Sequence, residues 1–262
     1  MTSSRMKHAL QVQIQSQPND SSCGPTCLAA VYQYWNDPVD LNQLIIEIGE
    51  LSSGGTLAVQ LGCHALQRGY DAVITTHNLQ VFDPSWFREP AGPDANWLAD
   101  KLKQQYAVKR TRPDTDQHRL QTATESYLKF LTLGGRIEMR PINEELIVST
   151  LSDGKPMLCG VSATYLYQER RERWQPADAQ GKTCVPDDIG GDPTGHFVVL
   201  HGYDPHSGNV QIADPLHPNP IAPSNQYVAA RSRVTAAILL GIVTYDANLL
   251  TLTPRSMREA SH

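Results

Sequence analysis

Gln17-Pro-Asn-Asp-Ser-Ser-Cys23-Gly-Pro-Thr-Cys-Leu-Ala-Ala30 is the most informative stretch of the sequence, because it predicts where the first helix begins. Pro25 suits a first helical turn, where its missing N–H would have no intrahelical partner. Apolar residues then recur at helical spacing, at Leu28 and Val31. The pattern predicts a helix that begins at Cys23.

Cys23 is the candidate nucleophile of this stretch. A helix N-terminus favours negative charge and therefore stabilises a thiolate, which is the reactive form of cysteine. Gln17 lies upstream, and its side-chain amide could donate to an oxyanion beside the backbone N–H of Cys23. The competing interpretation is a buried cysteine that acts only as a small hydrophobe. Later parts of the chain must decide between the two.

Composition is that of an ordinary soluble globular protein, with 40% of the 262 residues hydrophobic and 19% charged. The formal net charge is -5 and the pI is near 6.0. There is no dense Lys/Arg cluster that would attract phosphate backbones or acidic membranes. We therefore expect neither nucleic acid nor a membrane as a partner. The oligomeric state stays open.

Cysteine usage argues against both a disulfide framework and a zinc site. The five cysteines are odd in number and scattered, and none forms a Cys-x-x-Cys pair: Cys23, Cys27, Cys63, Cys159 and Cys184. No metal or other cofactor is expected. The first residues contain no apolar core of signal-peptide length, and no later stretch approaches a membrane span. A reducing, cytoplasmic setting is the expectation.

The first half of the chain is expected to be mainly helical. Helices are predicted at 23–35, from residue 40 and at 56–68, before a strand at 70–75. Residues 77–135 are interpreted as an inserted helical region, with helices near 95–106 and 118–133. A single domain over 17–253 is expected, with an N-terminal segment at 1–16 and a disordered tail at 254–262.

Strands dominate the second half. Strands are predicted at 137–142, 157–161, 196–203 and 210–215, followed by a helix near 225–234 and a last strand at 236–245. The turn at 204–209 makes a hairpin, and 163–195 is a long connection. Helices first and strands later indicate an α+β fold, with N-terminal helices packed on a C-terminal antiparallel sheet.

Asp214 discriminates between the two histidines of the 196–203 strand. Alternate side chains of a strand face opposite ways, so His196 and His201 lie on different faces. If residue 202 pairs with 208, or 204 with 208, Asp214 falls opposite or diagonal to His196 on one face. A one-residue slip would break this relation, and a bulge could reverse it. Strand geometry therefore favours His196.

The resulting hypothesis is a catalytic triad. Cys23 is the nucleophile, His196 is the general base and later the general acid, and Asp214 orients and stabilises the imidazolium. Gln17 completes the site as an oxyanion donor. A cysteine on an N-terminal helix that faces a histidine from a later strand is the layout of papain-like cysteine enzymes.

Three blocks of the chain resemble the bacteriocin-processing, double-glycine-type cysteine peptidase family, a papain-like group, and in particular its stand-alone members. The blocks are residues 17–29, 195–203 and 210–215, with weaker support from 154–158. The resemblance implies a papain-like fold and a peptide or protein substrate, cut after small residues. It also implies that Cys23, His196 and Asp214 form the triad and that Gln17 lies in the oxyanion hole.

Three alternatives stay open on the sequence alone. A papain-like acyl or dipeptidyl transferase, or a transglutaminase-type enzyme, would use the same triad and pass the acyl group to an amine. A catalytically silent peptide-binding module would use the cleft without the chemistry. A metal enzyme would use ligands that lie close in sequence, although their spacing fits no zinc pattern: His201, Asp204, His206, Asp214 and His217.

The acidic, glycine-rich loop at 187–192 could suggest cation binding, but its position ahead of His196 favours contact with substrate. We predict that Gly191, Asp192 and Gly195 bind substrate. Cys27, one helical turn beyond Cys23, is interpreted as a core residue.

Overall fold

The computed structural model describes residues 8–49, 55–89, 92–176, 184–244 and 246–259. Its centre is an eight-stranded sheet in the order β3-β2-β10-β4-β7-β8-β9, with β1 paired to β7. The strands are β1 (His8–Ala9), β2 (Tyr70–Thr76), β3 (Arg136–Glu138), β4 (Met157–Ser162), β7 (Gly195–Asp204), β8 (Asn209–Ala213), β9 (Gln226–Ala230) and β10 (Asn248–Pro254). Among the strands of the described residues, only β2 and β3 pair in parallel. The α+β class is confirmed.

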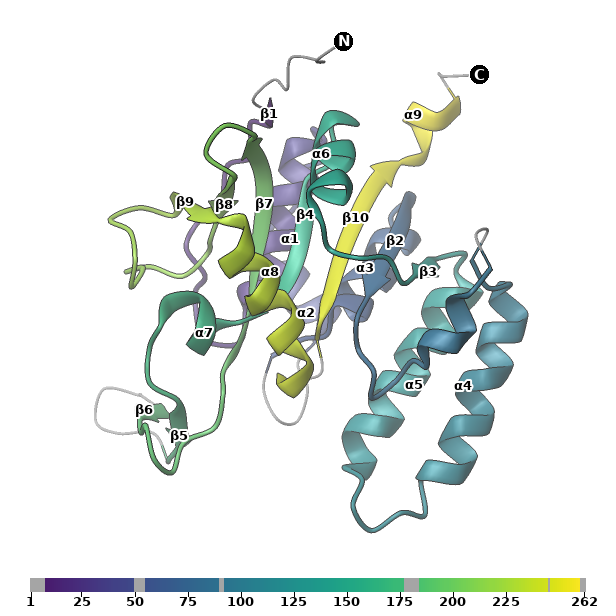
Figure 1. Cartoon of the computed structure of the whole chain (residues 1–262). Coiled ribbons are helices and arrows are strands. Elements are labelled where there is room, and N and C mark those ends of the chain that lie inside the picture. Colours follow the sequence, from purple (N-terminus) through teal and green to yellow (C-terminus); the bar gives the residue numbers. More distant parts are fainter. Residues whose placement is uncertain (1–7, 50–54, 90–91, 177–183, 245, 260–262) are drawn as a thin grey trace.

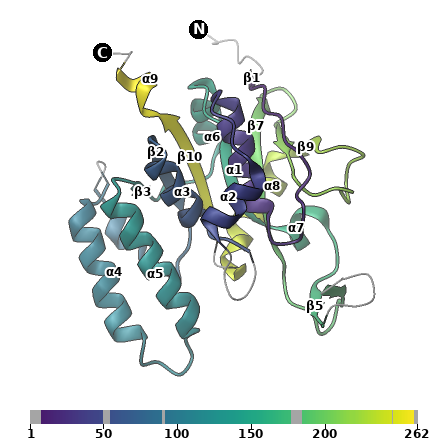
Figure 2. The ribbon, with the colours of Figure 1, turned by 180° about the vertical axis from the view of Figure 1, so that it is seen from behind.

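Helices cover both faces of this sheet (Figures 1 and 2). They are α1 (Cys23–Tyr34), α2 (Leu41–Ile48), α3 (Ala58–Gln67), α4 (Ala95–Lys109), α5 (Gln117–Thr132), α6 (Glu144–Ser152), α7 (Ala163–Tyr167), α8 (Arg231–Leu240) and α9 (Arg255–Glu259), with 3-10 turns η1 (Pro84–Phe87) and η2 (Gly241–Thr244). A separate pair, β5 (Glu172–Trp174) and β6 (Cys184–Pro186), lies outside the sheet. In the described part of the chain, no helix is long and apolar enough to cross a bilayer.

The helix α1 is the most deeply buried helix of the first half, and it packs on β7. Every residue from Cys23 to Tyr32 is buried. Gly24 allows the close approach, because a Cβ there would lie 3.2 Å from Cδ2 of Phe197 on β7 and 3.3 Å from Cδ1 of Leu61 on α3. A side chain at this position would force these two neighbouring side chains to shift by a few tenths of an ångström. The residue after Cys23 thus brings the start of α1 against the start of β7.

The two faces of the sheet carry separate hydrophobic clusters. On one face, α1 and α3 pack over Leu158, Phe197 and Val199. On the other face, α6, α7 and α8 pack over Val198 and Leu200. The alternation along β7 therefore divides its side chains between two buried faces, as expected of a central strand.

The helices α4 and α5 form the hairpin that projects in Figure 1. Leu98 and Leu102 of α4, with Tyr127 and Phe130 of α5, belong to the same buried cluster as α1 and α3. The two helices predicted for the 77–135 region are confirmed, and they share the core of the main sheet.

The C-terminal third differs from the sequence prediction. The predicted helix at 225–234 and strand at 236–245 are wrong, because β9 comes first, α8 covers Arg231–Leu240 and the last strand is β10. Val234, Ala237 and Ile238 are buried at helical spacing on the sheet. A short apolar run is compatible with either element until packing chooses one.

Both ends of the described chain contain regular structure where the sequence predicted none. Residues Arg255–Glu259 form α9, which corrects the disordered tail predicted from 254; residues 260–262 lie outside the described part. At the other end, β1 pairs with β7, and Val12 is buried in the first cluster. Part of the segment predicted to precede the domain therefore packs onto it.

Candidate active site

Cys23 is the first residue of α1 and is 7% exposed. The preceding residue does not cap the helix, because the Ser22 hydroxyl donates to the carbonyl of Asn19 at 3.0 Å. The first N–H groups of a helix have no intrahelical partner, and the N-cap residue Ser22 makes no side-chain hydrogen bond to them. An uncapped helix N-terminus is suited to hold a developing negative charge.

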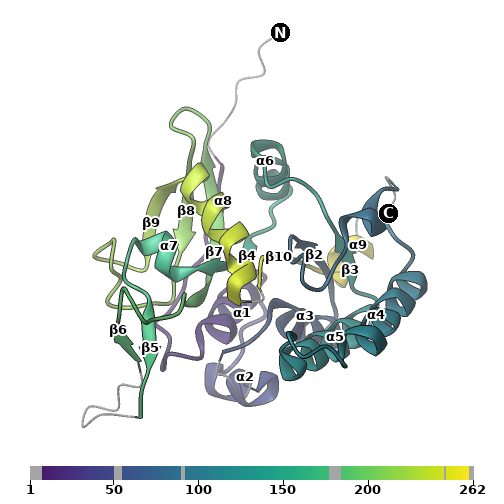
Figure 3. The same ribbon diagram turned by 60° about the horizontal axis from the view of Figure 1, so that its bottom comes forward.

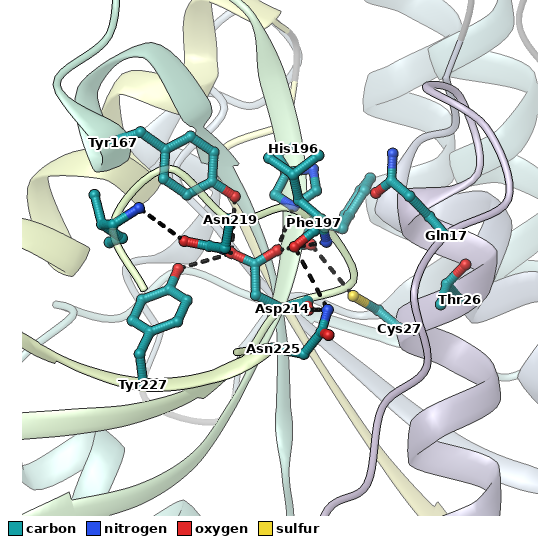
Figure 4. A network of polar contacts seen from close by, with 12 residues as sticks. Gln17, Thr26, Cys27, Tyr167, His196, Phe197, Asp214, Asn219, Asn225 and Tyr227 are labelled. Atoms are coloured by element: carbon teal, nitrogen blue, oxygen red, sulfur yellow. Dashed lines mark hydrogen bonds and ion pairs between the residues drawn. The ribbon is translucent and has the colours of Figure 1, made fainter. Parts of the chain in front are cut away.

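His196 is the second residue of β7 and lies beside Cys23. Its Nε2 is 2.9 Å from Oδ1 of Asp214 (Figure 4), and a hydrogen bond between the side chains of His196 and Cys23 contributes to the charge state of the ring. Because Asp214 occupies Nε2, Nδ1 is the ring nitrogen left to exchange a proton with the thiol. The three residues of the predicted triad are therefore brought together in the predicted order.

The environment of His196 favours its protonated form. Burial lowers the pKa of His196, but the charge and hydrogen bond of Asp214, with the Cys23 side chain, outweigh it and raise the pKa to about 10. An opposite charge at hydrogen-bond distance stabilises an imidazolium. The arrangement is suited to a base that retains the proton it takes from a thiol.

Asp214 is fully buried and accepts five hydrogen bonds (Figure 4). Its Oδ1 faces His196 Nε2 at 2.9 Å and the Leu216 N–H at 2.9 Å; its Oδ2 accepts from the Tyr167 hydroxyl at 2.8 Å, the Tyr227 hydroxyl at 2.7 Å and the Asn219 amide at 3.0 Å. Burial raises the pKa of Asp214, but His196 and these donors outweigh burial and lower it. Asp214 is thus held as a carboxylate.

The β7–β8 hairpin reaches this geometry by a different register from the one predicted at its turn. Asp204 pairs with Asn209, one residue away from the predicted partner, and a bulge between Leu200 and Gly202 absorbs the slip. Beyond the bulge, Leu200 pairs with Ile212, which is the second predicted register. Without the bulge, the one-residue shift would put Asp214 and His196 on opposite faces of the sheet. The bulge returns them to the same face, where Asp214 lies diagonal to His196.

His201, the histidine that strand geometry did not favour as the partner of Asp214, lies at this bulge. Its Nδ1 is 3.0 Å from the carbonyl of Leu10, and the Leu10 N–H donates back to the His201 carbonyl at 2.8 Å. His201 therefore binds the N-terminal segment that runs along β7, whereas His196 binds Asp214.

Gln17 is anchored beside Asp214 through its backbone, since its N–H donates to the carbonyl of Pro215 at 2.9 Å. Its side chain lies near α1 in Figure 4, and the amide nitrogen is already engaged in a hydrogen bond. Nε2 donates to the carbonyl of Asn19 at 2.9 Å, and the buried Oε1 has no hydrogen-bond partner among the described residues. An oxyanion role for Gln17 requires the second N–H of the amide or a rotation of the side chain.

The predicted substrate residues lie between the site and the β5–β6 pair. Gly195 begins β7 with Thr244 packed against it, and Asp192 is an exposed residue that exchanges backbone hydrogen bonds with Glu172 of β5. Gly191 has a packing role: a Cβ there would lie 2.4 Å from the Asp187 carbonyl oxygen. In Figure 3 the β5–β6 pair lies on one side of α1 and the α4–α5 hairpin on the other.

The 187–192 loop and Cys27 each make local contacts. Asp187 closes its own loop by accepting from the N–H groups of Ile189 and Gly190 at 3.1 and 2.7 Å. Among the described residues, no group of three or more His, Cys, Asp or Glu side chains is placed to hold a metal ion. Cys27 is fully buried and donates to the carbonyl of Phe197 at 3.3 Å, so its interpretation as a core residue is confirmed.

Sequence reasoning missed the residues that surround Asp214. Tyr167 lies at the end of α7, Asn219 lies in the β8–β9 loop and Tyr227 lies on β9. Tyr227 could have been found from the pairing of β9 with β8, but that segment was predicted to be helical. Tyr167 carries no local signal, because 47 residues separate it from Asp214.

The family model described as "Peptidase_C39 like family" matches residues 93–231, just over half of the chain. The chain belongs to this family. The match confirms the family resemblance seen in the sequence; it contains His196 and Asp214, while Cys23 and Gln17 lie N-terminal to it.

Curated proteins and solved structures were the two further comparisons for this member of the Peptidase_C39 like family. No curated protein matches the chain. Among solved structures, xylellain, a cysteine protease from Xylella fastidiosa, aligns over 94% of this chain and 85% of its own, at 15% sequence identity and a TM-score of 0.40. That similarity is too low to bear on function.

Proposed function

We propose that the protein is a cysteine peptidase that hydrolyses a peptide bond through a covalent acyl-enzyme on Cys23. The observation that carries the proposal is the placement of His196 between a cysteine at a helix start and a buried carboxylate, with 2.9 Å between Nε2 and Asp214 Oδ1. A nucleophile, a base and a residue that orients the base are the parts that such catalysis needs. Membership of a peptidase family supports the same reaction class.

In the proposed reaction, the Cys23 thiol gives its proton to Nδ1 of His196, and the thiolate attacks the carbonyl carbon of the scissile bond. The carbonyl oxygen becomes an oxyanion, stabilised by the backbone N–H of Cys23 and by the Gln17 amide. His196 then donates its proton to the leaving amine, and the carbon–nitrogen bond breaks. Water, activated by the neutral His196, releases the acyl group and restores the thiol.

Asp214 keeps the ring of His196 oriented through Nε2 and stabilises the imidazolium during this cycle. It does so as a carboxylate, since five donors hold it ionised. The substrate is proposed to be a peptide or protein with small residues at the cleavage site. A cytoplasmic setting is part of the proposal, supported by the five free cysteines.

Labelling by a thiol-directed probe tests the nucleophile. At low probe concentration, the wild type is expected to be labelled at Cys23, although Cys23 is buried and Cys184 is more exposed. Cys23→Ala should lose the label, and the matched control Cys184→Ala should keep it. Labelling that survives Cys23→Ala and disappears in Cys184→Ala would mean that exposure, and not the triad, sets reactivity.

Peptide profiling tests the reaction. Wild type and Cys23→Ala are compared on Gly-Gly-containing and unrelated peptides, with and without an added amine. Hydrolysis by the wild type alone supports the proposal, whereas conjugates formed in preference to hydrolysis would assign the protein to the transferases. Binding of peptides without turnover in either variant would indicate a silent binding module.

A further inference from the structure

We propose that Tyr167 and Tyr227 are positioning residues that act on His196 through Asp214. Their hydroxyls keep Asp214 anionic, fix its orientation and moderate how strongly it holds the imidazolium proton. The inference rests on the proposed function, because it concerns the charge state of the same site.

The two oxygens of Asp214 have different partners. Oδ1 faces His196, and Oδ2 receives both tyrosine hydroxyls, at 2.8 Å from Tyr167 and 2.7 Å from Tyr227. Asn219 supplies a third donor to Oδ2 at 3.0 Å. A carboxylate that is completely removed from water needs such donors to remain charged. The donors therefore replace the solvent that Asp214 lacks.

The tyrosines come from separate parts of the fold. Tyr167 ends α7, which follows β4, and Tyr227 lies on β9, which pairs with β8. The ring of Tyr167 also lies beside the ring of His196, with 6.0 Å between centroids and a tilt of 54°. Tyr167 thus contacts both members of the His196–Asp214 pair, whereas Tyr227 reaches the pair through its hydrogen bond to Asp214.

Both tyrosines remain donors over the working pH range. Burial, followed by the neighbouring charge of Asp214, raises the pKa of Tyr167 and the pKa of Tyr227 far above the ordinary value. Neither hydroxyl can therefore give up its proton to become a competing anion. Each is a permanent neutral donor to Oδ2.

A neutral donor on Oδ2 changes the basicity of the pair. It withdraws negative charge from the carboxylate, and it binds more strongly when His196 is neutral than when an imidazolium already shares that charge. Removing the donor therefore destabilises the state with neutral His196 more than the state with the imidazolium. His196 should then hold its proton to a higher pH.

Alkylation of Cys23 by iodoacetate, followed as a function of pH, tests this inference. The anionic reagent is attracted by the imidazolium, so the rate should fall where His196 loses its proton; His196→Gln should abolish this fall and thereby identify it. Tyr167→Phe and Tyr227→Phe keep the ring and remove one donor each. Each should move the fall to higher pH by roughly one unit, the size expected for one hydrogen bond to a charged group.

Tyr34→Phe is the matched control, because the Tyr34 hydroxyl donates to the carbonyl of Gly154 at 2.9 Å and makes no contact with Asp214. Asn219→Ala removes the third donor from a loop, and it decides the question if either tyrosine variant fails to fold. A shift to higher pH in these variants, with Tyr34→Phe unmoved, supports the inference. If the alkylation rate falls at the wild-type pH in Tyr167→Phe, Tyr227→Phe and Asn219→Ala, the inference is overturned.

The readout separates this inference from the proposed function. Alkylation depends on the Cys23 thiolate and the His196 imidazolium but requires no peptide turnover. A protein that shows the shifts and cleaves no peptide would contradict the peptidase assignment alone. A protein that cleaves peptides and shows no shifts would contradict the tyrosine roles alone.

Discussion

Asp214 and Asp246 are both buried aspartates, and their surroundings give them opposite charge preferences. Asp214 is fully buried, faces a histidine and accepts five hydrogen bonds. Asp246, only 6% exposed, accepts the N–H of Ala58 at 2.8 Å and a short hydrogen bond from Asn248. The pKa of Asp214 is lowered, whereas burial raises the pKa of Asp246 to about 7 in spite of its two donors.

The hydrogen-bonding and charged partners of a buried acid, more than its depth, therefore decide whether it is charged. Asp214 has a cation and four neutral donors, which together outweigh desolvation. The titratable groups that act with Asp246 are Tyr127 and Cys159, and neither is a cation. Asp246 caps the N-terminus of α3 by accepting a hydrogen bond from the N–H of Ala58, the first residue of that helix. The N-cap residue of α1, before Cys23, makes no such side-chain hydrogen bond.

Substituting Asp214 should change the rate of peptide cleavage far more than substituting Asp246. Asp214→Asn should lower the rate of peptide cleavage by about 10³- to 10⁴-fold, because His196 loses the charge that stabilises its imidazolium. Asp246→Asn is the matched control and should change the rate by less than about threefold, since Asp246 caps α3. Steady-state rates on one peptide measure both. Equal losses in the two variants would mean that Asp214 is only a structural acid.

The second prediction concerns the oxyanion donors near the N-terminus of α1. Gln17→Ala should lower kcat by about 10²-fold with little change in KM, because an oxyanion donor acts mainly in the transition state. Gln15→Ala, at an exposed position of the same segment, is the control. An unchanged kcat in Gln17→Ala would show that the observed hydrogen bond to Asn19 persists during turnover and that the α1 N-terminus stabilises the oxyanion alone.

The smallest effect is a difference in stability with pH. The folded-state pKa of Asp246 lies above the ordinary value of 3.8, so its contribution is fully present below pH 4 and is lost as the pH rises toward 7. The loss should approach about 1.4 kcal/mol per pH unit within that window. Asp214, with its lowered pKa, contributes in the opposite sense and loses stability only as the pH falls below the ordinary value.

Chemical denaturation of wild type and Asp246→Asn, each at pH 5 and pH 7, checks this prediction. The wild type should lose stability between the two values, and the variant should lose less. If both lose the same amount, Asp246 does not titrate in this window.

Much of the site could be predicted from sequence because its signals are local. Pro25 and the helical spacing after it marked the start of α1 at Cys23, where the structure places it. Strand alternation separated His196 from His201, and the structure places only His196 against Asp214. Both inferences depend on periodicity within one element or one hairpin, which is what a single sequence carries best.

The remaining features depend on contacts between distant segments. The bulge at His201 coincides with β1, whose Ala9 pairs with Gly202, so the hairpin register depends on a strand nearly two hundred residues away. Tyr227 was hidden because β9 was expected to be helical. A polar network around one buried carboxylate requires the tertiary fold to be known before its members can be named.

Nuclear magnetic resonance of the His196 ring, titrated in the wild type and in Asp214→Asn, tests most directly whether Cys23, His196 and Asp214 form one charged unit. We expect His196 in the wild type to stay protonated well above the ordinary pKa of 6.5, toward about 10, and Asp214→Asn to lower this pKa. A His196 that titrates at or below 6.5 in the wild type, and does not change in Asp214→Asn, would contradict this expectation.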